Sequence, residues 1–100
     1  MSTLQLMEGQ ASISTEILAR YAGDAAREIA GVRELRGRHA VKVEEEDGAV
    51  RVELHLEVEW GASIGEVGRG VQQRVRDYLL RMADVEPTEV EVVVDEIGPR

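Results

Sequence analysis

The sequence predicts an α+β fold, a two-layer sandwich in which two helices cover one face of a mostly antiparallel sheet. Residues 50–60 alternate strictly between apolar and polar side chains, as in a strand with one buried face. Residues 14–30 and 63–84 instead repeat their apolar side chains at helical spacing. The resulting order is β-α-β-β-α-β, and each element has one apolar side, so packing the helices on the sheet buries all of them.

The topology expected from this order is a ferredoxin-like split βαβ arrangement. It depends on a short first strand at residues 11–14, because if that segment is only an extended lead-in, the core becomes α-β-β-α-β. Ser14 can cap the first helix, which is expected to run to Ala30. Gly31 then suits a left-handed helix end, and residues 33–39 form a loop with three arginines.

The central hairpin carries the clearest signal. Asp47-Gly48 suits a two-residue type I′ turn, and this turn fixes which residues face each other. The expected pairs are Val43 with Val52 and Val41 with Leu54 inside, and Glu44 with Arg51 and Lys42 with Glu53 outside. Two apolar pairs and two opposite-charge pairs in one register support the hairpin.

The second helix is expected to begin at Ile64, because Ser63 and Glu66 have capping-box spacing. It ends near Asp84, and a last alternating strand runs over residues 90–94. Its predicted buried stripe consists of Ile64, Val67, Val71, Val75, Tyr78, Leu79 and Met82, and Trp60 is assigned to the buried face of the preceding strand. Within this helix Gly68 is expected to allow close approach to the sheet, whereas Gly70 lies outside the stripe and costs about 0.5–1 kcal/mol.

Composition limits the possible functions. The chain has 100 residues, 43% of them apolar, with a net charge of −8 and no cysteine, which is typical of one acidic globular domain without disulfides or cysteine-based zinc sites. Its apolar runs are far shorter than the roughly 20 residues of a membrane span, so no direct membrane insertion is expected. Residues 1–9 lack the features of a signal peptide and are interpreted as a mobile tail, residues 10–97 as the domain and residues 98–100 as a C-terminal tail.

No catalytic, cofactor or metal site is predicted. His55 lies between Glu53 and Glu57, but residues two apart on one strand face are too widely spread to chelate a metal well. No nucleophile or acid–base pair is held in a water-excluding concavity, so the chain is not expected to be an enzyme. Nucleic acid is an unlikely partner for an acidic chain, and the alternative function is a nucleic-acid-binding module that uses the 33–39 loop and a Gly65–Gly68 turn.

Charge divides the predicted surface into an acidic and a basic side. The open sheet face is acidic, whereas the outer side of the second helix is basic, so copies of the chain can stack head to tail. The candidate protein-interaction residues are Arg69, Gln73, Arg76 and Leu80 on the helix, and Glu53, His55, Glu57 and Glu91 on the sheet.

The order of these segments resembles the alkaline shock protein family, the envelope stress response proteins of Gram-positive bacteria. The resemblance covers roughly residues 9–97 and includes a helix ending in Gly31-Val32, the hairpin from Val41 to Leu54, Trp60-Gly61 before the second helix, and the Val90–Val94 strand. One departure is Ala83-Asp84, where the family often has glycine at the end of the second helix. The resemblance implies a cytoplasmic, non-enzymatic envelope stress response protein that self-associates and docks on an integral membrane partner, without a cofactor.

Overall fold

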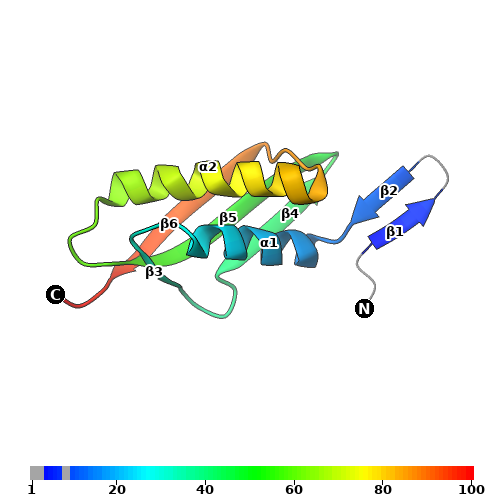
Figure 1. Ribbon diagram of the computed structural model, residues 1–100. Coiled ribbons are helices and arrows are strands. Elements are labelled where there is room, and N and C mark those ends of the chain that lie inside the picture. Colours follow the sequence, from blue (N-terminus) through cyan, green and yellow to red (C-terminus); the bar gives the residue numbers. More distant parts are fainter. Residues whose placement is uncertain (1–3, 8–9) are drawn as a thin grey trace.

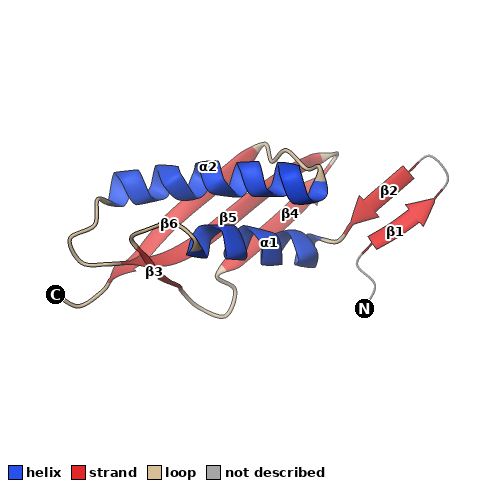
Figure 2. Ribbon diagram, in the orientation of Figure 1, coloured by secondary structure: helices blue, strands red, loops and turns tan. Residues whose placement is uncertain are grey.

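The computed structural model describes residues 4–7 and 10–100 and has the predicted two-layer α+β architecture (Figure 1). Both helices lie on one face of the sheet, and the other face is open (Figure 2). No helix in the described ranges is long and apolar enough to cross a membrane. The elements are β1 (Leu4–Met7), β2 (Gln10–Ile13), α1 (Thr15–Arg27), β3 (Val32–Leu35), β4 (Val41–Glu46), β5 (Ala49–Val58), α2 (Ile64–Ala83) and β6 (Glu89–Ile97).

The four-stranded sheet is built around β5. Both β4 and β3 pair with β5 antiparallel, β4 along its first part and β3 along its last three residues. Strand β6 pairs with β5 in parallel over residues 51–58, so it occupies the opposite edge. The sheet is therefore mostly antiparallel, as predicted, with one parallel edge strand.

The ferredoxin-like arrangement is wrong. The predicted first strand exists as β2, but it pairs with β1 in a separate two-stranded sheet that projects beyond the start of α1 (Figure 1). Residues 4–7, predicted to belong to a mobile tail, supply this partner, and a partner so close in sequence costs little loop-closure entropy. The core thus follows the α-β-β-α-β alternative with β3 added, whose last three residues lie in the segment predicted as the arginine loop. Residues 1–3 and 8–9 of the predicted tail lie outside the described residues, and the domain boundaries stay a prediction.

Local signals were predicted accurately. The hydroxyl of Ser14 accepts a hydrogen bond from the Ile17 amide and that of Ser63 accepts one from the Glu66 amide, so both caps are confirmed. All four predicted hairpin pairs occur in the observed register. Asp47 and Gly48 have positive φ values of 53° and 81°, as a type I′ turn requires.

Residues with positive φ lie after both helices, although only the second helix is capped by one. The first helix ends at Arg27 rather than Ala30, and Gly31, with φ of 96°, directs the chain into β3. The second helix is capped by Asp84, whose φ is 56° and whose amide donates to the Leu80 carbonyl. A left-handed cap favours glycine, which accounts physically for the glycine often found here in the resembling family.

The core lies between the helices and the sheet, and it corrects both the predicted burial of three side chains and the predicted roles of two glycines. Its fully buried side chains include Leu18, Val52, Leu54, Leu56, Val58, Val71, Val75 and Leu79. Trp60, Ile64 and Met82 are exposed instead, because β5 ends at Val58 and the other two lie at the ends of α2. Gly68 was expected to allow close approach to the sheet, but nothing lies within 4 Å of a Cβ built there; a Cβ on Gly70 would contact Ile29, after α1, at 3.4 Å.

Candidate functional site

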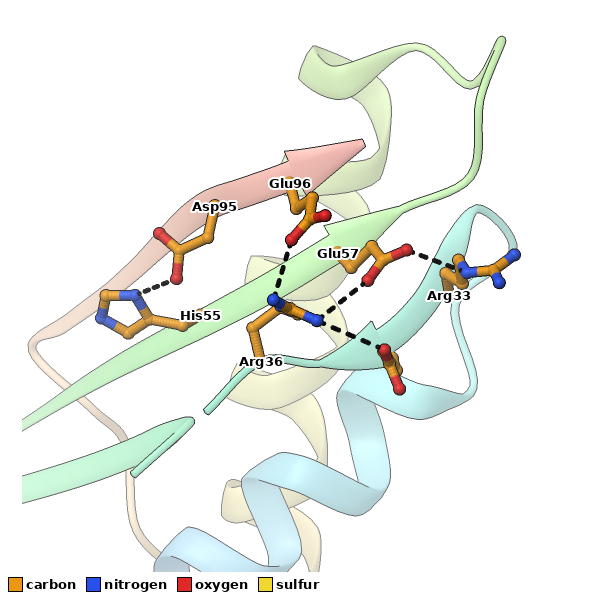
Figure 3. A network of polar contacts seen from close by, with 7 residues as sticks. Arg33, Arg36, His55, Glu57, Asp95 and Glu96 are labelled. Carbon is orange, nitrogen blue, oxygen red and sulfur yellow. Dashed lines mark hydrogen bonds and ion pairs between the residues drawn. The ribbon is translucent and has the colours of Figure 1, made fainter. Parts of the chain in front are cut away.

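The open sheet face carries an ionic network centred on Glu57 (Figure 3). The Glu57 side chain is only 7% exposed, although its sequence position predicts a solvated acid. Arg33 Nε lies 2.9 Å from its Oε2, and Arg36 Nη1 lies 3.4 Å from its Oε1. Arg36 also reaches Glu96 at 2.8 Å, so one guanidinium connects β5 with the end of β6.

Two β-bulges flank Glu57 and position the network. On β3, the register shifts between Val32 and Glu34, which makes Arg33 the extra residue. On β6, the register shifts after Val94, so that Asp95 is the extra residue and Glu96 pairs with Glu57. Bulges redirect side chains. Here they bring the Arg33 guanidinium and the Asp95 carboxylate to the open sheet face.

His55 bridges β5 and β6 beside this network. Its Nε2 lies 2.6 Å from Glu53 Oε2, and its Nδ1 lies 2.9 Å from Asp95 Oδ2. Hydrogen bonds to Glu53 and then to Asp95 raise the pKa of His55 above its usual 6.5, and burial opposes them. Since only the imidazolium donates from both nitrogens, the geometry favours a charged ring.

The sheet-side residues predicted as a contact surface divide into two groups. Glu53 and His55 contact each other, and exposed Glu91 pairs with Glu53 in the parallel register. The Glu57 carboxylate is buried and paired with Arg33 and Arg36, so its charge is compensated within the network and is not presented to a partner. Asp95 and Glu96 were not among the predicted site residues, because a bulge has no clear sequence signal.

The helix-side residues lie on the opposite layer of the sandwich. Arg69, Gln73 and Leu80 are exposed along α2, and the Gln73 amide donates to Asp77 at 3.0 Å. Arg76 is half-buried and donates to the Pro87 carbonyl at 2.9 Å, which ties it to the loop before β6. The structure therefore leaves three of the four predicted residues on the outer surface of α2.

A groove around Trp60 was missed by sequence reasoning. It is open to solvent, has a volume of about 550 Å³, and lies where the α1–β3 connection, the β5–α2 connection and the start of α2 meet. Trp60 is 56% exposed, and the guanidinium of Arg100 lies 5.1 Å from its ring centroid. The alternation of apolar and polar residues along β5 predicted that the indole is buried. The available signal that the strand ends earlier was Gly61, directly after Trp60. The lining residues are Ile29, Ala30, Gly31, Glu59, Trp60, Gly61, Ala62, Ser63, Glu66 and Val67.

Other chemistry finds little support in this arrangement. Within residues 4–7 and 10–100 there is no group of three or more histidine, cysteine or acidic side chains arranged to hold a metal. The nucleic-acid alternative needs free arginines and a flexible glycine turn. Of the three loop arginines, Arg33 and Arg36 are paired with carboxylates and Arg38 is exposed, while Gly65 and Gly68 lie within α2.

Comparison with known proteins gives both a family and a fold. Residues 36–99 match the model of the alkaline shock protein family, which is described as having a cell envelope-related function. The uncharacterized protein YqhY of Bacillus subtilis (strain 168) is 30% identical over 99 residues, covering 84% of this chain and 73% of that protein. Solved structures of the MamM CTD have the same fold: one variant has a TM-score of 0.58 at 11% identity, over 82% of this chain and 96% of that chain. A manganese form of another variant has a TM-score of 0.57 at 12% identity, over 82% of this chain and 98% of that chain.

Proposed function

The chain belongs to the alkaline shock protein family, whose function is related to the cell envelope, and from this premise we propose how it acts there. It is a non-enzymatic envelope stress response protein. It self-associates and docks on a membrane-anchored partner at the cytoplasmic side of the envelope.

The distribution of charge between the two layers carries the proposal. Half-exposed Glu53 and exposed Glu91 lie on the open sheet face, and exposed Arg69 lies on the outer surface of α2. Because the helices cover the other face of the sheet, these surfaces point in opposite directions (Figure 2). A contact between unlike surfaces is heterologous and extends into rings or filaments.

Leu80 adds an apolar side chain to the basic surface. It is exposed on α2, in the same stripe as Arg69 and Gln73. Isolated exposed ion pairs contribute only about 0–1 kcal/mol, so a stable contact needs such apolar burial beside the charges. The sheet offers Val93, half-buried and paired with His55, as the matching apolar side chain.

Sedimentation of single and mixed charge-reversal variants tests this assembly. Arg69→Glu and Glu91→Lys should each shift the distribution toward monomer at moderate salt. Mixing the two variants should restore the larger species as an alternating assembly, because the new glutamate meets the new lysine at one contact and Arg69 meets Glu91 at the next. Matched controls are Arg20→Glu and Glu16→Lys, exposed on α1 and carrying the same charge changes. Unchanged sedimentation of both variants, with circular dichroism showing native folding, would refute the assignment of these surfaces.

Docking on a membrane-anchored partner needs a separate experiment. Vesicles carrying the reconstituted partner should retain the protein in flotation assays, whereas protein-free vesicles of the same lipids should not. Equal retention on both would argue for direct lipid binding and against the proposed partner.

A further inference from the structure

We propose that the groove around Trp60 is the docking site for a basic segment of a partner protein, with an arginine or lysine side chain stacked on the indole. This inference deepens the proposed function and rests on it, because it states which chemistry the membrane-anchored partner presents.

The indole is already arranged as a cation receptor. Trp60 is more than half exposed, and Arg100 of the same chain stacks over it at 5.1 Å. Cations within about 6 Å of an aromatic centroid are attracted to its face, and tryptophan gives the strongest such contact. The Arg100 contact therefore shows that the face is accessible to a guanidinium.

The lining of the groove complements a cation with an apolar neighbour. Glu59 and Glu66 contribute negative charge, and none of the described residues that line the groove is a lysine or arginine. Half-buried Ile29 and Ala62 contribute apolar surface to the same groove. A partner segment with alternating basic and apolar side chains matches this pattern, whereas an acidic segment is repelled.

The membrane-anchored partner in the proposed function supplies such a basic segment. Loops next to transmembrane helices carry an excess of lysine and arginine on the cytoplasmic side. A membrane-anchored partner therefore presents basic side chains where this chain would meet it. Arg100 acts as an internal competitor, which the incoming cation displaces from Trp60.

The protein has a single tryptophan beside two tyrosines, so fluorescence excited selectively at the indole reports on this groove alone. The probe is a capped eight-residue peptide of alternating arginine and alanine. The matched control peptide has citrulline in place of arginine, which keeps the shape and removes the charge. We expect a saturable change in fluorescence with the arginine peptide and none with the citrulline peptide.

Variants of the whole chain separate the groove from general charge attraction. Arg100→Ala should tighten binding about two- to fivefold, because it removes a competing cation–π contact. The double variant Glu59→Gln, Glu66→Gln should weaken binding at least tenfold, and glutamine preserves the capping box at the start of α2. The control Glu45→Gln, Glu46→Gln makes the same charge change on the exposed hairpin turn and should leave the affinity unchanged.

Three outcomes would overturn the inference: equal binding of the citrulline peptide, no gain from Arg100→Ala, or an equal loss with the hairpin control. Its failure is distinct from failure of the proposed function. If the groove variants bind the arginine peptide with the same affinity as the unchanged protein, the docking site is wrong. If sedimentation still responds to Arg69→Glu in that case, self-association stands. Peptide binding by a chain that stays monomeric would support the groove and remove the assembly mechanism.

Discussion

Removing both arginines from Glu57 should destabilise the domain by more than the sum of the two single substitutions. The carboxylate is 7% exposed and is held by Arg33 at 2.9 Å and Arg36 at 3.4 Å. Either arginine alone still offers a countercharge, whereas the double variant leaves a buried carboxylate uncompensated.

The magnitudes follow from the exposure of the partners. A hydrogen bond to a charged group contributes about 1.5–3 kcal/mol, and the arginine side chains are 49% and 41% exposed, which allows water to replace part of each contact. We therefore expect the free energy of unfolding to fall by about 1–1.5 kcal/mol in Arg33→Ala and by about 1 kcal/mol in Arg36→Ala. An uncompensated buried charge costs about 3–5 kcal/mol, so the double variant should exceed the sum by about 1–2 kcal/mol.

Urea denaturation followed by far-UV circular dichroism measures these free energies of unfolding. Adding Glu57→Gln to the double variant should recover stability, because it removes the unpaired charge. Arg51→Ala is the matched control: its pairing with Glu44 is 4.0 Å long and exposed, so the change should be below about 0.5 kcal/mol. Additive losses, with no recovery by Glu57→Gln, would show that Glu57 is solvated and refute the reasoning.

Three further substitutions test particular contacts. The raised pKa of His55 means that its charged form stabilises the fold below about pH 6.5 and that this contribution is lost as pH rises through the folded pKa; His55→Gln should flatten that decline in urea titrations. Gly98→Ala should destabilise the domain by about 1–3 kcal/mol in thermal melts, because its Cβ would lie 2.8 Å from Arg33 Cδ and displace the network; no change would mean that the segment moves aside. Gly68→Ala should raise stability by about 0.5–1 kcal/mol, since the added methyl meets nothing within 4 Å; a loss would place an unseen contact there.

Features determined by neighbouring residues were predictable from the sequence. The hairpin register follows from Asp47-Gly48, because a two-residue turn fixes one pairing, and that pairing keeps apolar residues opposite apolar residues. The caps at Ser14 and Ser63 likewise depend on residues within one helical turn. The sheet around these signals was less predictable, because strand β3 has four residues and half of them are charged.

The candidate site was only partly predictable, because bulges and strand ends create it. His55 and Glu53 share a face by simple alternation and were placed together correctly. Arg33 and Asp95 reach the same face only because each is an extra residue in its strand, which pairing decides and composition does not. Trp60 shows the converse: alternation assigns it to the core, but the strand ends two residues earlier.

The ionic network and the Trp60 groove are connected through the last residues of the chain. The buried Gly98 donates its amide to the Val58 carbonyl at 2.7 Å and packs against Arg33 and Glu57. Two residues later, Arg100 lies over Trp60, which itself follows Val58 by two residues. The Arg33–Glu57 pair thus holds the segment that delivers the internal competitor to the indole. Disrupting the pair should release Arg100 and tighten peptide binding in the groove, even though Arg33 does not line it, and fluorescence titration of Arg33→Ala can detect this coupling.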